Sequence, residues 1–217
     1  MQKYKNILKD RNEATQKLKE MLPLQKIKEQ EWIFLAVSRG GLVIADGLRG
    51  ATGNKIDFIF SESITAPNNP ECEIARVSEN EDIIIIDELV RAFDIQYDYI
   101  YGEAHRKHEE QILSSIYKYR KGHALLDLKD RVVLLVDEGS ETGVILTTAL
   151  KSVLNLHPKA VYIASPILPT TVLENLEPFA DEIFCAYSID DYVQTTLYYK
   201  QLPKVDEASI EKILGEK

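Results

Sequence analysis

One segment, residues 131–150 (RVVLLVDEGSETGVILTTAL), constrains the fold more than any other part of the chain. Residues 132–136 form an unbroken run of branched aliphatic residues of strand length. Such a run, without polar alternation, is typical of a strand buried on both faces of a parallel sheet. The small residues that follow allow a tight turn, and residues 144–154 carry the apolar spacing of a helix. The segment therefore predicts a strand–loop–helix unit of an α/β protein.

Two adjacent carboxylates, Asp137 and Glu138, stand where this strand ends. In the loop behind them backbone N–H groups can converge, and the helix N-terminus adds unpaired N–H donors with a partial positive charge, which favours a phosphate. Paired carboxylates beside a phosphate suit the hydroxyls of a sugar. The plainer reading is that the carboxylates cap the turn or face water. We predict a sugar-phosphate site in which the carboxylates hold ribose and the 5′-phosphate lies in a loop formed by Gly139, Ser140, Glu141, Thr142 and Gly143.

A second turn, Arg39-Gly40-Gly41, follows another apolar run at residues 32–37. In an open parallel sheet, loops at the carboxyl ends of strands collect around one pocket, so the two turns are expected to face each other. Arg39 would supply charge, and the absence of a Cβ at Gly40 and Gly41 would let an anion approach their amides. An ordinary glycine turn beside a surface cation is the alternative. A nicotinamide dinucleotide site is disfavoured because the glycines do not form the GxGxxG spacing.

The strand, acidic pair and Thr-Gly loop look like the phosphoribosyl-diphosphate loop of type I phosphoribosyltransferases. Further resemblance lies in WIFLAVSRGGL at 32–42, LKDRNEATQKL at 8–18, APNNPE at 66–71 and DELVRAFDI at 87–95. From about residue 8 to about residue 200 the pattern resembles a bacterial group of predicted phosphoribosyltransferases. The resemblance implies an open, mostly parallel twisted sheet with helices on both faces. It also implies one domain over 1–217, with a hood inserted at about 61–122 that covers the site and selects the acceptor base.

The same resemblance implies transfer of a 5-phosphoribosyl group from phosphoribosyl diphosphate to an unidentified base or amine, with release of pyrophosphate. Asp137 and Glu138 would be the catalytic pair, since the ribosyl centre gains positive charge in the transition state. Residues 39–41 would contact pyrophosphate. A formal net charge of −9 would repel such an anionic substrate, so Mg2+ is expected, held mostly by substrate oxygens and water.

Several positions depart from the family pattern. Ile145 replaces the second hydroxyl of Thr-Gly-x-Thr, Glu141 brings a negative charge into the phosphate loop, and Glu62-Ser63 stand where related sequences often carry Arg-Lys. Each lost charged hydrogen bond would weaken binding by about 1.5–3 kcal/mol. The alternative is therefore a catalytically impaired module, which either senses a nucleotide such as a nucleoside monophosphate or binds another protein. A phosphohydrolase lacks a nucleophile signature.

The remaining sequence sets broad limits. The acidic balance argues against a nucleic-acid surface, and no segment approaches the roughly 20 apolar residues of a membrane span. The N-terminus lacks a secretory pattern, so a cytoplasmic protein with two free cysteines is expected. His105 and His108 are read as solvated hood surface, and the segment beyond about Leu202 as a surface helix or a contact of a homodimer. We predict helices near 10–22, 41–52, 96–121, 143–155 and 205–214, and strands near 32–37, 56–60, 82–86, 131–137, 160–164 and 182–185.

Overall fold

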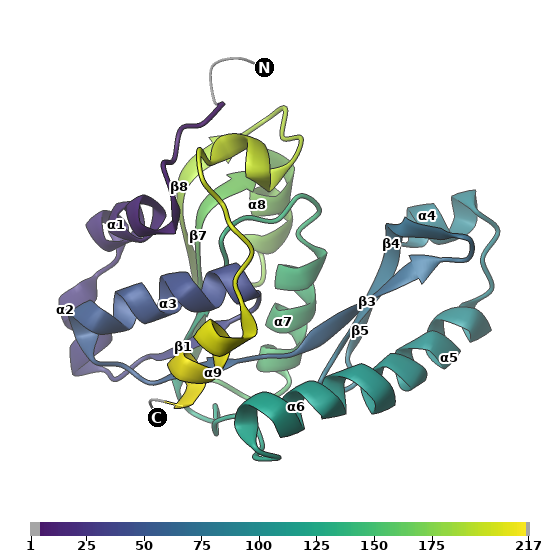
Figure 1. Cartoon of the computed structure of the whole chain (residues 1–217), viewed down its shortest axis with the longest axis horizontal. Helices are drawn as coiled ribbons and strands as arrows, with labels where there is room; N and C mark the ends of the chain where they lie inside the picture. Colours follow the sequence, from purple (N-terminus) through teal and green to yellow (C-terminus); the bar gives the residue numbers. More distant parts are fainter. Residues whose placement is uncertain (1–4, 216–217) are drawn as a thin grey trace.

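The computed structural model describes residues 5–215 and contains a five-stranded parallel sheet (Figure 1). Its strand order is β2-β1-β6-β7-β8, so the two strands that precede the predicted site loops, β1 and β6, lie side by side at its centre. The α/β fold with an open parallel sheet is confirmed. The strands are β1 Ile33–Ala36, β2 Ile56–Phe58, β6 Val132–Val136, β7 Ala160–Pro169 and β8 Glu182–Ile189.

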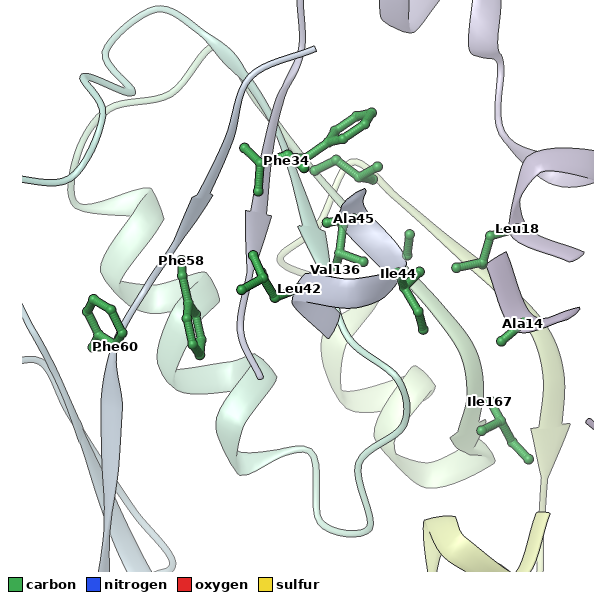
Figure 2. Packing of buried hydrophobic residues seen from close by; sticks show 14 of the residues in the cluster. Ala14, Leu18, Phe34, Leu42, Ile44, Ala45, Phe58, Phe60, Val136 and Ile167 are labelled. Atoms are coloured by element: carbon green, nitrogen blue, oxygen red, sulfur yellow. The ribbon is translucent and has the colours of Figure 1, made fainter. Parts of the chain in front are cut away.

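Helices cover both faces of this sheet because its central strands alternate between two apolar clusters. Phe34 and Val136 point into the cluster shared with α1, α3 and α9, which Figure 2 shows between α3 and the strands. Leu35 and Leu135 point into the opposite cluster with α7 and α8. The helices of the first face are α1 Arg11–Met21, α2 Leu24–Glu29, α3 Arg39–Thr52 and α9 Glu207–Gly215, and those of the second are α7 Val144–Leu154 and α8 Thr170–Leu176.

A second, antiparallel sheet projects from the main body together with the long helical segment beside it (Figure 1). We call residues 61–122 the hood. Its strands are β3 Ser61–Ala66, β4 Asn69–Ser78 and β5 Ile83–Ile85, and its helices are α4 Asp87–Ala92, α5 Tyr97–Lys107 and α6 Leu113–Arg120. A π-helical turn at His108–Ile112 joins α5 to α6, so the single helix predicted over 96–121 is continuous but irregular.

Within the hood, a buried polar contact joins α6 to the turn after β4. Arg120 pairs with Glu79, and its guanidinium lies 5.1 Å from the centre of the Phe60 ring. The Nε2 atom of His108 lies 3.1 Å from the carbonyl oxygen of Glu79. His108 is therefore buried, and its placement on a solvated surface was wrong; His105 on the same helix is exposed. These contacts hold the hood helices against the hood's own sheet.

The sequence missed α2, α4, α8 and the strands β3 and β4. The segment Thr65 to Glu71 contains a two-residue reversal at 67–68, with Asn68 at a φ of 61°. Asn69 and Pro70 belong to β4 instead. Among residues 5–215, no helix is both long enough and apolar enough to cross a membrane.

Candidate functional site

The loops after β1 and β6 meet through a hydrogen bond between Ser38 and Asp137. The Ser38 hydroxyl caps α3, accepting from the Gly41 amide at 3.0 Å, and donates to Oδ1 of Asp137 at 2.5 Å. Asp137 is 1% exposed, and its Oδ2 atom has no hydrogen-bond partner among residues 5–215. Burial raises the pKa of Asp137 to about 7, although the hydrogen bond from Ser38 acts in the opposite direction.

Glu138 is held from the other side by residues of the chain termini. Arg11, in the first turn of α1, donates from Nε to the Glu138 carboxylate at 2.6 Å, and the Tyr199 hydroxyl donates to the Glu138 carbonyl at 2.7 Å. Arg11 also donates to the carbonyl of Pro203 at 2.8 Å. The predicted carboxylate pair thus divides: Asp137 is buried and accepts from Ser38, whereas Glu138 is ion-paired with Arg11.

The loop after Glu138 presents unpaired backbone donors. Gly143 donates to the Ser140 hydroxyl at 3.0 Å, and Val144 to the Thr142 hydroxyl at 3.4 Å, so both hydroxyls serve the turn itself. For the amides of residues 139–142, no acceptor lies within residues 5–215. A cavity of about 190 Å3 opens beside them, lined by Ser38, Glu73, Arg76, Asp137, Glu138, Gly139, Ser140, Glu141, Thr142 and Ile145. We call it the loop cavity.

Glu141 does not turn its carboxylate onto these amides. Its Oε1 atom accepts from both the backbone amide and the hydroxyl of Thr195, each at 2.8 Å. Thr195 lies in the segment after β8, residues 190–203, which we call the C-terminal strap. The negative charge that Glu141 brings into the loop is therefore bonded to Thr195, although Glu141 still lines the loop cavity.

The residues of the Arg39-Gly40-Gly41 turn have two different roles: Arg39 lines a cavity, and the two glycines allow close packing. Arg39 lines a neighbouring cavity of about 220 Å3, which we call the hood cavity; its wall is formed by Val37, Ser38, Arg39, Phe58, Phe60, Ser61, Glu62, Ser115, Tyr119 and Ile145. Gly40 and Gly41 are buried and line neither cavity. A Cβ at Gly40 would lie 1.9 Å from the Glu138 carboxyl carbon, and one at Gly41 would lie 2.3 Å from the Val136 carbonyl oxygen. The two glycines thus let α3 approach β6 closely.

Gly143 also has a packing role in the structure. Its φ of 71° is left-handed, and a Cβ there would lie 2.6 Å from a methyl group of Val172. Gly139, by contrast, lines the loop cavity, and its φ is 140°. Of the predicted loop, residues 139–142 face the cavity and Gly143 starts the helix.

Three residues of the site were missed by sequence reasoning. Arg76 and Glu73 of β4 line the loop cavity, and Arg11 fixes Glu138. Arg11 lies inside LKDRNEATQKL, a segment already singled out, but nothing local in that helix shows which side chain reaches the site. The position of Arg76 in the cavity wall depends on the pairing of β3 with β4, and the sequence did not predict that pairing.

Comparison with known proteins agrees with this geometry. No family model matches the sequence. Two Mycobacterium tuberculosis proteins, from strains CDC 1551 and H37Rv and both named "Putative phosphoribosyl transferase", are each 22% identical to the chain over 176 residues. The matched region is 81% of this chain and 39% of each relative, so the chain spans about two fifths of their length.

Among solved structures, the protein TT1426 from Thermus thermophilus superposes with a TM-score of 0.73 at 26% identity, covering 96% of this chain and 98% of that one. A hypoxanthine phosphoribosyltransferase from Staphylococcus aureus matches at 11% identity with a TM-score of 0.49, covering 87% and 79% of the two chains. The central parallel strands, the acidic pair with its amide-lined loop, and the sequence match to the M. tuberculosis proteins converge on one assignment. The chain resembles the type I phosphoribosyltransferases.

Proposed function

We propose that the loop cavity binds the 5-phosphoribosyl group of phosphoribosyl diphosphate and that the protein transfers this group to a base or amine, releasing pyrophosphate. One observation carries the proposal. Four successive amides without an acceptor in residues 5–215 stand next to a buried carboxylate whose Oδ2 is also unpartnered. Donors in such a row suit a phosphate, and an unpaired carboxylate oxygen suits a sugar hydroxyl.

Each predicted residue has a place in this proposal. The amides of residues 139–142 would hold the 5′-phosphate, and Asp137 would accept hydrogen bonds from ribose. Glu138, fixed by Arg11, would place negative charge near the ribosyl centre, where positive charge develops. Arg39 would meet the diphosphate in the hood cavity, which shares Ser38 and Ile145 with the loop cavity. Gly40, Gly41 and Gly143 would act by shaping the walls.

The loop cavity fits Mg2+ entering with the substrate. Its wall carries the carboxylates of Glu73, Asp137, Glu138 and Glu141, and Oδ2 of Asp137 is unpaired. Within residues 5–215 there is no group of three or more histidine, cysteine or acidic side chains arranged to hold a metal unaided. Substrate oxygens and water would therefore supply most of the ligands, and the ion would neutralise the departing diphosphate.

A second candidate is a module that binds a nucleoside monophosphate without transfer. The hood cavity favours it, because Phe58, Phe60 and Tyr119 line this space together with Glu62, while Arg39 is its only cation among the lining residues. Aromatic walls suit a base better than a diphosphate. Ile145, which borders both cavities, adds no hydroxyl for phosphate.

Isothermal titration calorimetry with phosphoribosyl diphosphate, with and without Mg2+, tests the proposal. We expect micromolar, metal-dependent binding that Asp137→Asn abolishes. Asp98→Asn is the matched control, since it removes the same charge from an exposed position of the hood. Binding of nucleoside monophosphates alone would favour the second candidate. If Asp137→Asn still binds both phosphoribosyl diphosphate and nucleoside monophosphates like wild type, both candidate functions are contradicted.

Turnover must then be measured as pyrophosphate release with a panel of purines, pyrimidines and other amines. Release that depends on one acceptor and disappears in Asp137→Asn supports transfer. Tight binding with no release for any acceptor leaves the binding module as the function.

A further inference from the structure

We propose that Arg76 is a substrate-binding residue that supplies the cation for the 5′-phosphate, in place of basic side chains missing from β3. This inference rests on the proposed function, because it assigns a residue to the phosphate subsite of the same cavity. Arg76 lines the loop cavity together with residues 137–142. It is the only lysine or arginine among the lining residues.

The pairing of β3 with β4 places Arg76 where a cation is missing. Arg76 lies directly opposite Ser63, and Val77 lies opposite Glu62. Opposed residues of an antiparallel pair share a face, and successive residues alternate between faces. Ser63 and Arg76 are therefore on one face and Glu62 is on the other; Glu62 borders the hood cavity, as does Ser61. A positive charge from β4 thus shares a face with Ser63, one of the two positions at which the resemblance implies a cation on β3.

Neighbouring residues position the Arg76 guanidinium but leave one of its nitrogens without a hydrogen bond to residues 5–215. Nε donates to the Glu73 carboxylate at 2.8 Å, and Nη1 donates to the Ser61 hydroxyl at 3.1 Å. The Arg76 side chain is only 15% exposed, so its conformation is confined. Nη2 makes no hydrogen bond to residues 5–215 and remains able to donate to an anion.

The second departure, Ile145, lies in the wall of the same cavity. An aliphatic side chain there leaves the phosphate one hydroxyl donor short, while Arg76 brings a charged donor to this wall. Charged donors to phosphate are stronger than neutral ones. Glu73 limits the effect, because its carboxylate neutralises part of the guanidinium charge. In this chain the Arg76 guanidinium would thus take over phosphate binding from two groups of the family pattern: the hydroxyl at position 145 and the basic side chains of β3.

Calorimetry with two probes, ribose 5-phosphate and phosphoribosyl diphosphate with Mg2+, separates the subsites. Arg76→Gln is expected to weaken both ligands by the same factor, ten-fold or more, because both carry the 5′-phosphate. Arg39→Gln should weaken the diphosphate alone. Glu73→Gln should tighten both, since it leaves the Arg76 charge uncompensated. Arg106→Gln is the matched control: Arg106 is also ion-paired with glutamates, but it is exposed on the hood helix α5 and lines neither cavity.

The outcomes are distinguishable. If wild type binds neither probe, the proposed function fails and this inference fails with it. If wild type binds and Asp137→Asn does not, yet Arg76→Gln and Glu73→Gln both bind like wild type, only the inference is overturned. Weakening of the diphosphate alone by Arg76→Gln would also overturn the assignment to the 5′-phosphate. If circular dichroism shows that Arg76→Gln folds poorly, two other variants decide. Arg76→Lys is expected to lose part of the affinity for both probes, and Glu73→Gln is expected to gain affinity for both.

Discussion

Ser38 and Asp137, which end two neighbouring strands of the sheet, are joined by a hydrogen bond of 2.5 Å from hydroxyl to carboxylate. The bond links the loop that leads to Arg39 with the loop that leads to the unpaired amides. It also confines a buried carboxylate whose second oxygen has no partner in residues 5–215. A carboxylate held in this way costs stability when charged and offers an acceptor when a sugar hydroxyl arrives.

The stability of the protein should therefore depend on pH through Asp137. Its pKa of about 7 in the folded state exceeds the ordinary unfolded value of about 3.9. The folded state thus binds the proton more tightly, and this contribution is full below about pH 4 and lost as pH rises through 7. Asp137→Asn lacks this dependence. Relative to the variant, wild type should lose on the order of 2–4 kcal/mol between pH 4 and 8.

Urea unfolding of both proteins at several pH values measures the difference. Asp98→Asn, at an exposed hood position, controls for the general effect of removing one carboxylate. A constant difference between wild type and Asp137→Asn across this range would show that Asp137 titrates normally in the folded protein.

Gly40→Ala should destabilise the protein, whereas Gly50→Ala in the same helix should not. A Cβ at Gly40 overlaps the Glu138 carboxyl group, so either Glu138 leaves Arg11 or α3 moves away from β6. Overpacking of this kind costs about 1–3 kcal/mol. No atom lies within 4 Å of a Cβ at Gly50, which is exposed, and alanine in a helix gains about 0.5–1 kcal/mol over glycine. Thermal unfolding of the pair compares the same substitution in one helix; equal shifts would show that Gly40 has no special packing role.

The centre of this fold was predictable because its signals are local. The run at 132–136 is fully buried, as an aliphatic stretch of strand length should be, and the acidic pair and loop follow it directly. The parallel order then brings the ends of β1 and β6 together without further information.

The remaining elements depended on contacts between distant residues. β3 (SESITA) is too polar to be recognised as a strand, and its pairing with β4 decides its structure. The strand predicted near 160–164 continues as β7 to Pro169, through Pro166, although proline is unusual inside a sheet. Beyond Ala164, β7 pairs only with β8, so the missing N–H of Pro166 can face the open side.

The same limit applies to the site. Arg11 and Glu138 are 127 positions apart and Glu141 and Thr195 are 54 apart, and neither pair has a sequence signal that links its members.

Glu141→Gln should strengthen phosphate binding without loosening the C-terminal strap. Glutamine keeps an oxygen that can accept from Thr195, while the negative charge beside the four amides disappears. Because Glu141 is exposed, the gain in affinity for ribose 5-phosphate should stay below about tenfold and shrink as salt rises. Glu141→Ala removes both charge and acceptor, so its calorimetric affinity reports how much the strap organises the loop. Weaker binding in Glu141→Gln than in wild type would show that the carboxylate charge itself holds the loop in its binding conformation.

Ile145→Thr tests whether this chain is an impaired member of its family. Ile145 lies in the first turn of α7 and borders both cavities, so a hydroxyl there would stand beside the loop that is proposed to hold phosphate. A hydrogen bond to a charged group contributes about 1.5–3 kcal/mol, which corresponds to roughly ten-fold or more in affinity for ribose 5-phosphate. Ile145→Val is the control, because it trims the same side chain without adding a donor. Equal affinities for the two variants would mean that phosphate does not reach this turn. Stronger binding by Ile145→Thr together with pyrophosphate release that wild type lacks would identify the missing hydroxyl as the cause of lost transfer.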